Sequence, residues 1–111
     1  MMVRITLNDV DDEYGRIRFD LSIDAQNRPM KDMVWFGFEG SLNDLENSHP
    51  VMLNQSGTID LGDAYDVHCR YHKTNLLEKE IKVKSYVTIW WKYETEKTEV
   101  VYFIEAITLL T

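Results

Sequence analysis

The chain has 111 residues, a length that suits one domain, so we expect a single domain over residues 1–111. Hydrophobic residues make up 44% of the sequence and only two prolines are present, a composition that excludes a disordered chain. The formal net charge of −7 argues against nucleic acid and membrane surfaces as partners and permits a basic protein partner. No apolar stretch has the length of a membrane span or a signal peptide. The single cysteine, Cys69, fits a reducing compartment, and we expect a cytoplasmic protein.

Apolar and polar residues alternate in two segments near the amino end. Residues 3–8 predict a first strand, and residues 15–24 predict a second. In the second strand, the apolar side chains that share one face are Ile17, Phe19, Leu21 and Ile23. Residues 33–38 are instead a continuous apolar run, which predicts a strand buried on both faces.

The middle of the chain predicts one short helix and two further strands. Ser41 can cap a helix over residues 41–47, which would need to pack on the sheet to persist. Residues 58–61 predict a short strand, and residues 64–72 alternate again. In that segment one predicted face carries Tyr65, Val67, Cys69 and Tyr71, and the other carries Asp66, His68, Arg70 and His72. On this assignment Cys69 would be buried and unreactive.

The last thirty residues predict a long β-hairpin. Residues 81–93 and 98–110 flank a polar turn, and both faces of the pair are apolar. If Tyr93 lies opposite Thr98, one face holds Val83, Val87, Ile89, Trp91, Val100, Tyr102, Ile104 and Ala106. The other face then holds Tyr86, Trp90, Val101, Phe103, Ile107 and Leu109. Each arm would span about 43 Å, so we expect the hairpin to coil, to carry a bulge or to project from the body.

Together these elements predict a mainly β fold. We expect an antiparallel β-sandwich or curled sheet of about seven strands, with one short helix and the long C-terminal hairpin.

Two groups of side chains invite a metal-site interpretation, and the spacing argues against both. The turn with Asp9, Asp11 and Glu13 resembles the start of a calcium-binding loop, but Tyr14 stands where that loop needs glycine. On a strand, His68 and His72 would lie about 13 Å apart, too far to share one ion. We therefore expect no metal and no cofactor.

Two surfaces are candidates for binding. The strand predicted over residues 64–72 offers a Tyr, His and Arg cleft for a small ligand, formed by Tyr65, His68, Arg70 and Tyr71. The second hairpin face, with Tyr86, Trp90 and Phe103, is an interface anchor if no segment of the chain covers it. A homodimer would be one use of that face.

The acidic charge is concentrated in the first part of the chain. Residues 1–66 hold 13 acidic and 5 basic residues, a net of −8, while residues 67–111 hold 6 acidic and 7 basic residues, a net of +1. A basic protein partner would therefore meet the acidic turn at Asp11, Asp12 and Glu13.

Three functions remain open from the sequence. The leading hypothesis is a non-catalytic acidic binding module that neutralises a partner protein. Bacterial or phage immunity and inhibitor proteins are similar in size, charge and cysteine content, although no motif is shared. The first alternative is a ligand-binding or enzymatic β-sandwich that uses the Tyr, His and Arg cleft. The second is a structural subunit that oligomerises through the C-terminal hairpin.

Overall fold

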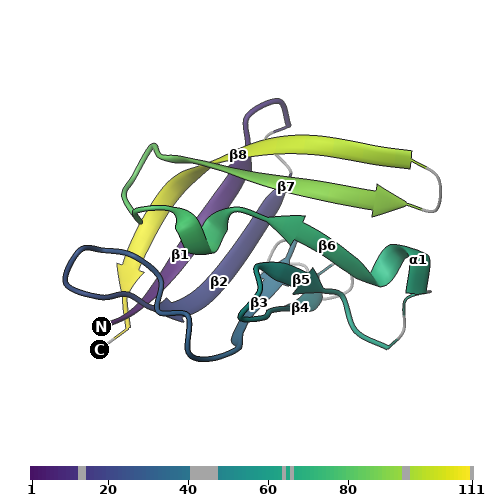
Figure 1. Ribbon diagram of the computed structural model, residues 1–111. Helices are drawn as coiled ribbons and strands as arrows, with labels where there is room; N and C mark the ends of the chain where they lie inside the picture. The colour runs from purple at the N-terminus through teal and green to yellow at the C-terminus, as the bar shows by residue number, and fades with distance from the viewer. Residues whose placement is uncertain (13–14, 41–47, 64, 66, 94–95, 111) are drawn as a thin grey trace.

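The computed structural model describes residues 1–12, 15–40, 48–63, 65, 67–93 and 96–110. Eight antiparallel strands follow one another in chain order and close into a barrel (Figure 1). The strands are β1 (Met2–Asp9), β2 (Arg16–Ser22), β3 (Trp35–Glu39), β4 (His49–Leu53), β5 (Thr58–Asp60), β6 (Tyr71–Thr74), β7 (Tyr86–Tyr93) and β8 (Glu96–Leu109). A four-residue helix, α1 (Val67–Arg70), and a 3₁₀ turn, η1 (Leu76–Glu78), join the later strands. Neither of these helical segments of the described chain is long enough to cross a membrane.

The predicted mainly β, antiparallel character is confirmed, but the seven-stranded sandwich is wrong. A sandwich keeps two sheets with free edges, whereas here the last strand closes the sheet on itself. The 14-residue β8 makes this closure, because its first part pairs with β7 and its second part pairs with β1. The short helix predicted over residues 41–47 lies outside the described residues.

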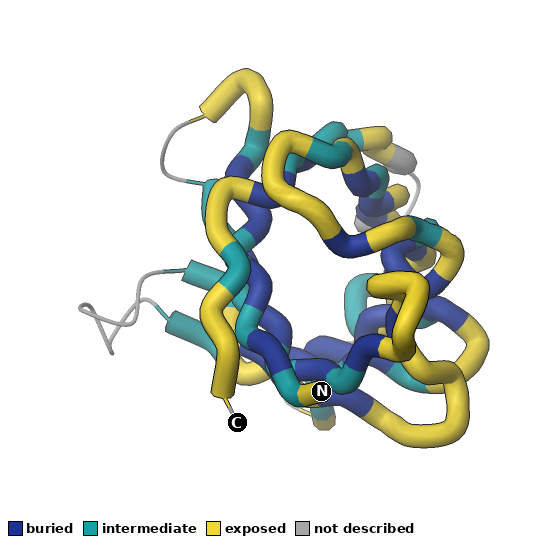
Figure 2. The backbone as a smooth tube through the Cα atoms, turned by 90° about the vertical axis from the view of Figure 1, so that its left-hand side faces the viewer, coloured by how far each residue is buried: buried dark blue, intermediate teal, exposed yellow. Residues whose placement is uncertain are grey.

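The hydrophobic core fills the barrel. Along β2, Ile17, Phe19 and Leu21 are buried while the residues between them are half-exposed, as the alternation predicted. Figure 2 shows the same alternation of buried and more exposed positions along the backbone tube. The fully buried side chains include Ile5, Leu7, Phe19, Leu53, Ile59, Leu76, Val87, Ile89 and Ile104.

The apolar run at residues 33–38 is not covered on both faces. In β3, Trp35 and Gly37 point inward, whereas Phe36 is 63% exposed and Phe38 also faces solvent. A strand of this barrel has one face on the core and one on water, so hydrophobicity alone overestimated the burial. Gly37 itself allows β2 and β3 to approach closely, because a Cβ there would lie 1.9 Å from the carbonyl oxygen of Arg18.

The strand predicted over residues 64–72 is also corrected. The chain forms α1 there, and β6 begins only at Tyr71, with Tyr71 exposed and His72 buried. The predicted faces are therefore reversed at Tyr71 and His72. Cys69 lies on α1 and is half-exposed, so its predicted burial is wrong. Bonds from Arg70 to Asp60 favour this course of the chain, since they hold the end of α1 against β5.

The C-terminal hairpin coils and carries a bulge, two of the three predicted outcomes. Its observed register places Tyr93 opposite Glu96, a shift of two residues that leaves each side chain on its predicted face. The residues after the bulge are the exception. Glu105 has no partner in β1, so the side chains that follow it point to the faces opposite to those predicted. Ala106 consequently faces outward and Ile107 packs against the core, opposite to the prediction. Val83 precedes β7 and is exposed.

Candidate functional site

The end of the barrel away from the chain termini has a polar interior. Most inward positions are aliphatic, but at this end β3 finishes with Glu39 and β4 begins with His49. The two residues are cross-strand partners, and Ile17 of β2 flanks Glu39 on its other side. Residues directly opposite on neighbouring strands have Cβ atoms about 5 Å apart, so the sheet itself brings this carboxylate and imidazole together.

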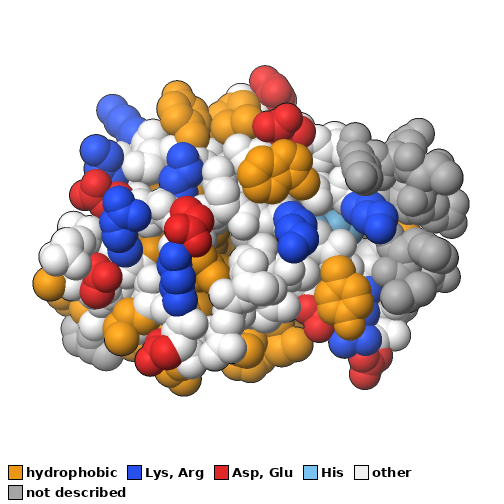
Figure 3. Space-filling view, viewed as in Figure 1, with side chains coloured by type: hydrophobic (Ala, Val, Ile, Leu, Met, Phe, Trp, Pro, Cys, Tyr) orange, Lys and Arg blue, Asp and Glu red, His pale blue; other side chains and the backbone are white. Residues whose placement is uncertain are grey.

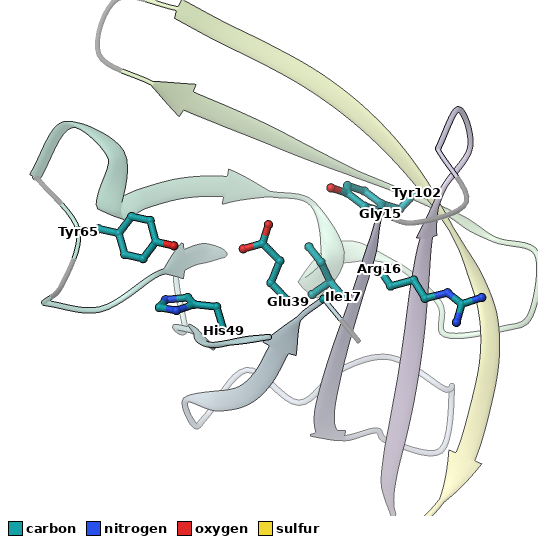
Figure 4. A pocket seen from close by; sticks show the side chains of 8 residues that line it. Gly15, Arg16, Ile17, Glu39, His49, Tyr65 and Tyr102 are labelled. Atoms are coloured by element: carbon teal, nitrogen blue, oxygen red, sulfur yellow. The ribbon is translucent and has the colours of Figure 1, made fainter. Parts of the chain in front are cut away.

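These side chains surround a cavity of about 290 Å³, which we call the barrel mouth. Its lining includes Gly15, Ile17, Glu39, His49, Tyr65 and Tyr102. In Figure 4 the Glu39 carboxylate and the hydroxyl groups of Tyr65 and Tyr102 all point into one space. Arg16 also borders the mouth, but its guanidinium group is directed away, toward Asn8 at 3.2 Å and Glu105 at 3.8 Å.

The carboxylate of Glu39 is the unusual group in the mouth. It is half-buried, and within the described chain it has no hydrogen-bond or ion-pair partner. Burial raises the pKa of Glu39 above its ordinary value, because removal of water disfavours the charged form, and the nearby His49 opposes the rise. A proton or a nearby positive charge would offset this cost of burying the carboxylate.

His49 presents its ring beside this carboxylate in a fixed orientation. Its Nε2 atom donates a hydrogen bond of 2.7 Å to the carbonyl oxygen of Leu61. The ring also packs edge-on against Tyr65, with 4.8 Å between the ring centroids. His49 therefore contributes an aromatic ring in a fixed orientation to the wall of the mouth.

On the other side of the mouth, Tyr102 belongs to a bonded cluster of three rings. The hydroxyl oxygen of Tyr102 accepts a 3.1 Å hydrogen bond from Nε1 of Trp91, which packs edge-on against His72 at 4.7 Å. Nε2 of His72 donates to the carbonyl oxygen of Cys69 at 2.7 Å, and its Nδ1 accepts from the backbone N–H of Lys92 at 2.9 Å. Burial lowers the pKa of His72, and the bond to Cys69 opposes this only in part. The cluster is neutral and positions Tyr102.

Tyr65 is held over the mouth by the loop between β5 and α1. Arg70 bonds both carboxylate oxygens of Asp60, at 2.7 and 3.2 Å, and also contacts Asp63 at 2.7 Å. The bond from Arg70 lowers the pKa of Asp60, so the pair remains ionised. Asp60 further accepts the N–H of Gly62, whose carbonyl oxygen accepts the N–H of Tyr65.

The described members of the predicted Tyr, His and Arg cleft do not line one common cavity. Tyr65 lines the barrel mouth, while Tyr71 faces outward from β6. Arg70 is bonded to Asp60 and Asp63, and its guanidinium carbon lies 5.0 Å from the centroid of the Tyr71 ring. The His68 side chain lies outside what the structure describes.

The other predicted binding residues lie on the surface. Asp11 and Asp12 are exposed in the turn after β1, and Glu13 falls outside the described residues. On the second hairpin face, Tyr86 and Trp90 are exposed and Phe103 is half-buried, so no described segment covers this face. Binding at either place stays a prediction. Among the described residues, no three His, Cys, Asp or Glu side chains are grouped to hold a metal ion.

Sequence reasoning missed Glu39 and His49. A signal was present, since Glu39 continues the inward series of Trp35 and Gly37, and His49 continues that of Val51 and Leu53. A polar residue at an inward position near a strand end indicates a polar barrel end. Comparisons with protein-family models, curated proteins and solved structures each found no match. The site is therefore interpreted from its own geometry.

Proposed function

We propose that the protein is a non-catalytic binding module whose barrel mouth holds a positively charged nitrogen group, an ammonium or a guanidinium, against Glu39. One observation carries the proposal. Glu39 is a half-buried carboxylate without a partner in the described chain, and its pKa is raised by burial. Burying an unpaired charge costs free energy, which an incoming cation with good geometry would recover.

The surroundings of Glu39 suit such a group. Tyr65 and Tyr102 offer aromatic surface and hydroxyl oxygens, and a cation over a tyrosine ring gains about 0.5–2 kcal/mol. The cavity of about 290 Å³ admits a small amine or the end of a lysine or arginine side chain. The one guanidinium that borders the mouth, on Arg16, is bonded elsewhere and leaves Glu39 unpaired.

The net charge of −7 favours a basic protein as the source of the group. Such a partner would place one lysine or arginine side chain in the mouth and meet exposed acids such as Asp11 and Asp12 around it. This is the arrangement expected of a module that neutralises a basic partner, since complementary charge speeds encounter and rejects wrong partners.

Binding of small cations tests the proposal. Agmatine and n-butylamine, titrated into ¹⁵N-labelled protein, should shift the amide signals around Glu39 and His49. Replacement Glu39→Gln should weaken binding by about tenfold or more, because the pairing charge is lost. The matched control is Glu80→Gln, which removes an exposed acid outside the mouth and should leave binding unchanged. Equal binding by the Glu39→Gln protein would refute the proposal.

A second comparison separates the two sources of the cation. The peptide acetyl-Gly-Arg-Gly-Lys-Gly-amide should bind about tenfold more tightly than agmatine if a basic protein supplies the group. The double replacement Asp11→Asn and Asp12→Asn should then remove most of that advantage. Equal affinities for agmatine and the peptide would identify a small amine instead.

A further inference from the structure

A groove of about 750 Å³ lies on the outside of the barrel along β6 and β7. The two strands part here, since their pairing is limited to Lys73 with Trp90 and Thr74 with Ile89. Beyond that point the backbone N–H of Lys92 bonds to the side chain of His72 in place of a β6 carbonyl. The buried His72 therefore takes the place of a strand partner for Lys92 beside the groove.

Aromatic rings and lysines alternate over this groove. Lys73 lies directly opposite Trp90, and two residues further along the same outer face lie Tyr71 and Lys92. Tyr71 is 44% exposed and Trp90 is 42% exposed, so both rings are available to a partner. In Figure 3 hydrophobic and basic side chains are interspersed over the region of β6 and β7.

The local charge of the groove is opposite to that of the whole chain. Lys73 and Lys92 line it, and among the described residues Glu99, opposite Trp90 on β8, is the one acid in its lining. No described carboxylate forms an ion pair with either lysine. Arg70 lies over Tyr71 but is already paired with Asp60 and Asp63. Two lysines that have no ion-pair partner in the described chain, beside two exposed rings, would attract carboxylates and aromatic side chains.

We propose that this groove binds an acidic, aromatic-containing extended segment of a partner protein. Tyrosine or phenylalanine side chains of the segment would pack on Trp90 and Tyr71, and its carboxylates would pair with Lys73 and Lys92. A protein segment is favoured over single-stranded nucleic acid because a phosphate chain needs a longer cationic track, and the chain as a whole carries −7. At physiological salt the acidic turns elsewhere are screened beyond about 8 Å.

The test uses the peptide acetyl-Glu-Tyr-Glu-Tyr-Glu-amide as probe. Trp90 is the only half-exposed tryptophan, because Trp35 and Trp91 are buried, so its indole signal in an NMR titration reports on the groove. Lys73→Gln and Lys92→Gln should each weaken binding by about twofold to fivefold, and Glu99→Gln should strengthen it to a similar degree. Lys82→Gln, an exposed lysine outside the groove, is the matched control and should have no effect.

Several results would overturn the proposal. One is equal affinity for a peptide with glutamine in place of each glutamate, because the lysines would then play no part. Tighter binding of an eight-residue oligothymidylate would assign the groove to nucleic acid. Self-association in sedimentation that is lost in a folded Trp90→Ser protein would assign it to a second copy of the chain. Unchanged peptide affinity in both lysine variants would remove the charge argument directly.

Discussion

Two polar clusters meet at the same end of the barrel, and they differ in how many of their polar atoms are hydrogen-bonded. In the bonded cluster, His72, Trp91 and Tyr102, both nitrogens of the histidine and the indole N–H are hydrogen-bonded. In the open cluster, Glu39, His49 and Tyr65, the carboxylate has no partner in the described chain. Buried polar groups are normally satisfied, so the first cluster has a structural role and the second is where we propose that a ligand binds.

Among the changes considered, replacing the two histidines should give the largest difference in stability between the clusters. His72→Ala removes a side chain that is 1% exposed and its hydrogen bonds to Cys69 and Lys92, and should lower the free energy of unfolding by about 3 kcal/mol. His49→Ala removes a half-exposed ring with one bond and should cost about 1 kcal/mol. Urea unfolding of both variants measures the difference. Equal losses would show that the distinction between the clusters is wrong.

A smaller effect is expected at the boundary between the clusters. Tyr102→Phe removes the oxygen that accepts the N–H of Trp91 and should cost about 1–2 kcal/mol, while the ring still packs in the core. The same change should also weaken binding of agmatine, because the hydroxyl lines the mouth. Tyr86→Phe is the control, since Tyr86 lies exposed on the outer face. A stability unaffected by Tyr102→Phe would mean that the bond to Trp91 contributes nothing.

The pH dependence of stability should reveal the buried, neutral histidine of the bonded cluster. His72 is neutral in the folded state, and burial lowers its pKa below the ordinary value of 6.5. The contribution of His72 to the free energy of unfolding is therefore complete above pH 6.5. It is lost as the pH falls toward the lower folded-state pKa, because the histidine of the unfolded chain then takes up a proton that the folded chain does not. The stability gap between the native protein and His72→Ala should narrow over that range. A gap that widens on acidification would contradict the assigned protonation state.

In the open cluster, acidification should stabilise the fold at Glu39 instead of destabilising it. Burial raises the pKa of Glu39, so its ionised form destabilises the fold at neutral pH. Glu39→Gln should therefore raise the melting temperature slightly at pH 7, and the gain should disappear as the pH falls below the unfolded pKa of glutamate. Glu80→Gln should show no such gain. A variant that trades higher stability for lost binding is expected where a group serves function.

The sequence predicted the strands whose alternation is local, and it failed where long-range pairing decides. The alternation of Ile17, Phe19 and Leu21 placed β2 and its inward face correctly. Closure of the barrel depends on the pairing of β8 with β1 and on the bulge at Glu105, neither of which leaves a local pattern. The apolar run with Phe36 imitated a strand buried on both faces, although its outer side chains face solvent.

The candidate site was missed for a related reason. Whether Glu39 points inward or outward depends on which face of β3 meets the core, and that run offered apolar residues on both faces. Once Trp35 and Gly37 are known to be inward, Glu39 follows by the two-residue period. The alternation at residues 64–72 misled in the same way, because α1 replaces its first part and reverses the faces of Tyr71 and His72.

The most direct measurement is the pKa of the Glu39 carboxyl group, followed by ¹³C NMR with and without agmatine. The account predicts a pKa above the ordinary glutamate value in the free protein, because the group is half-buried and has no partner in the described chain. Saturating agmatine should lower that pKa, since a positive charge against the carboxylate favours its ionised form. An ordinary or lowered pKa in the free protein that agmatine leaves unchanged would contradict the central claim that Glu39 awaits a cationic partner.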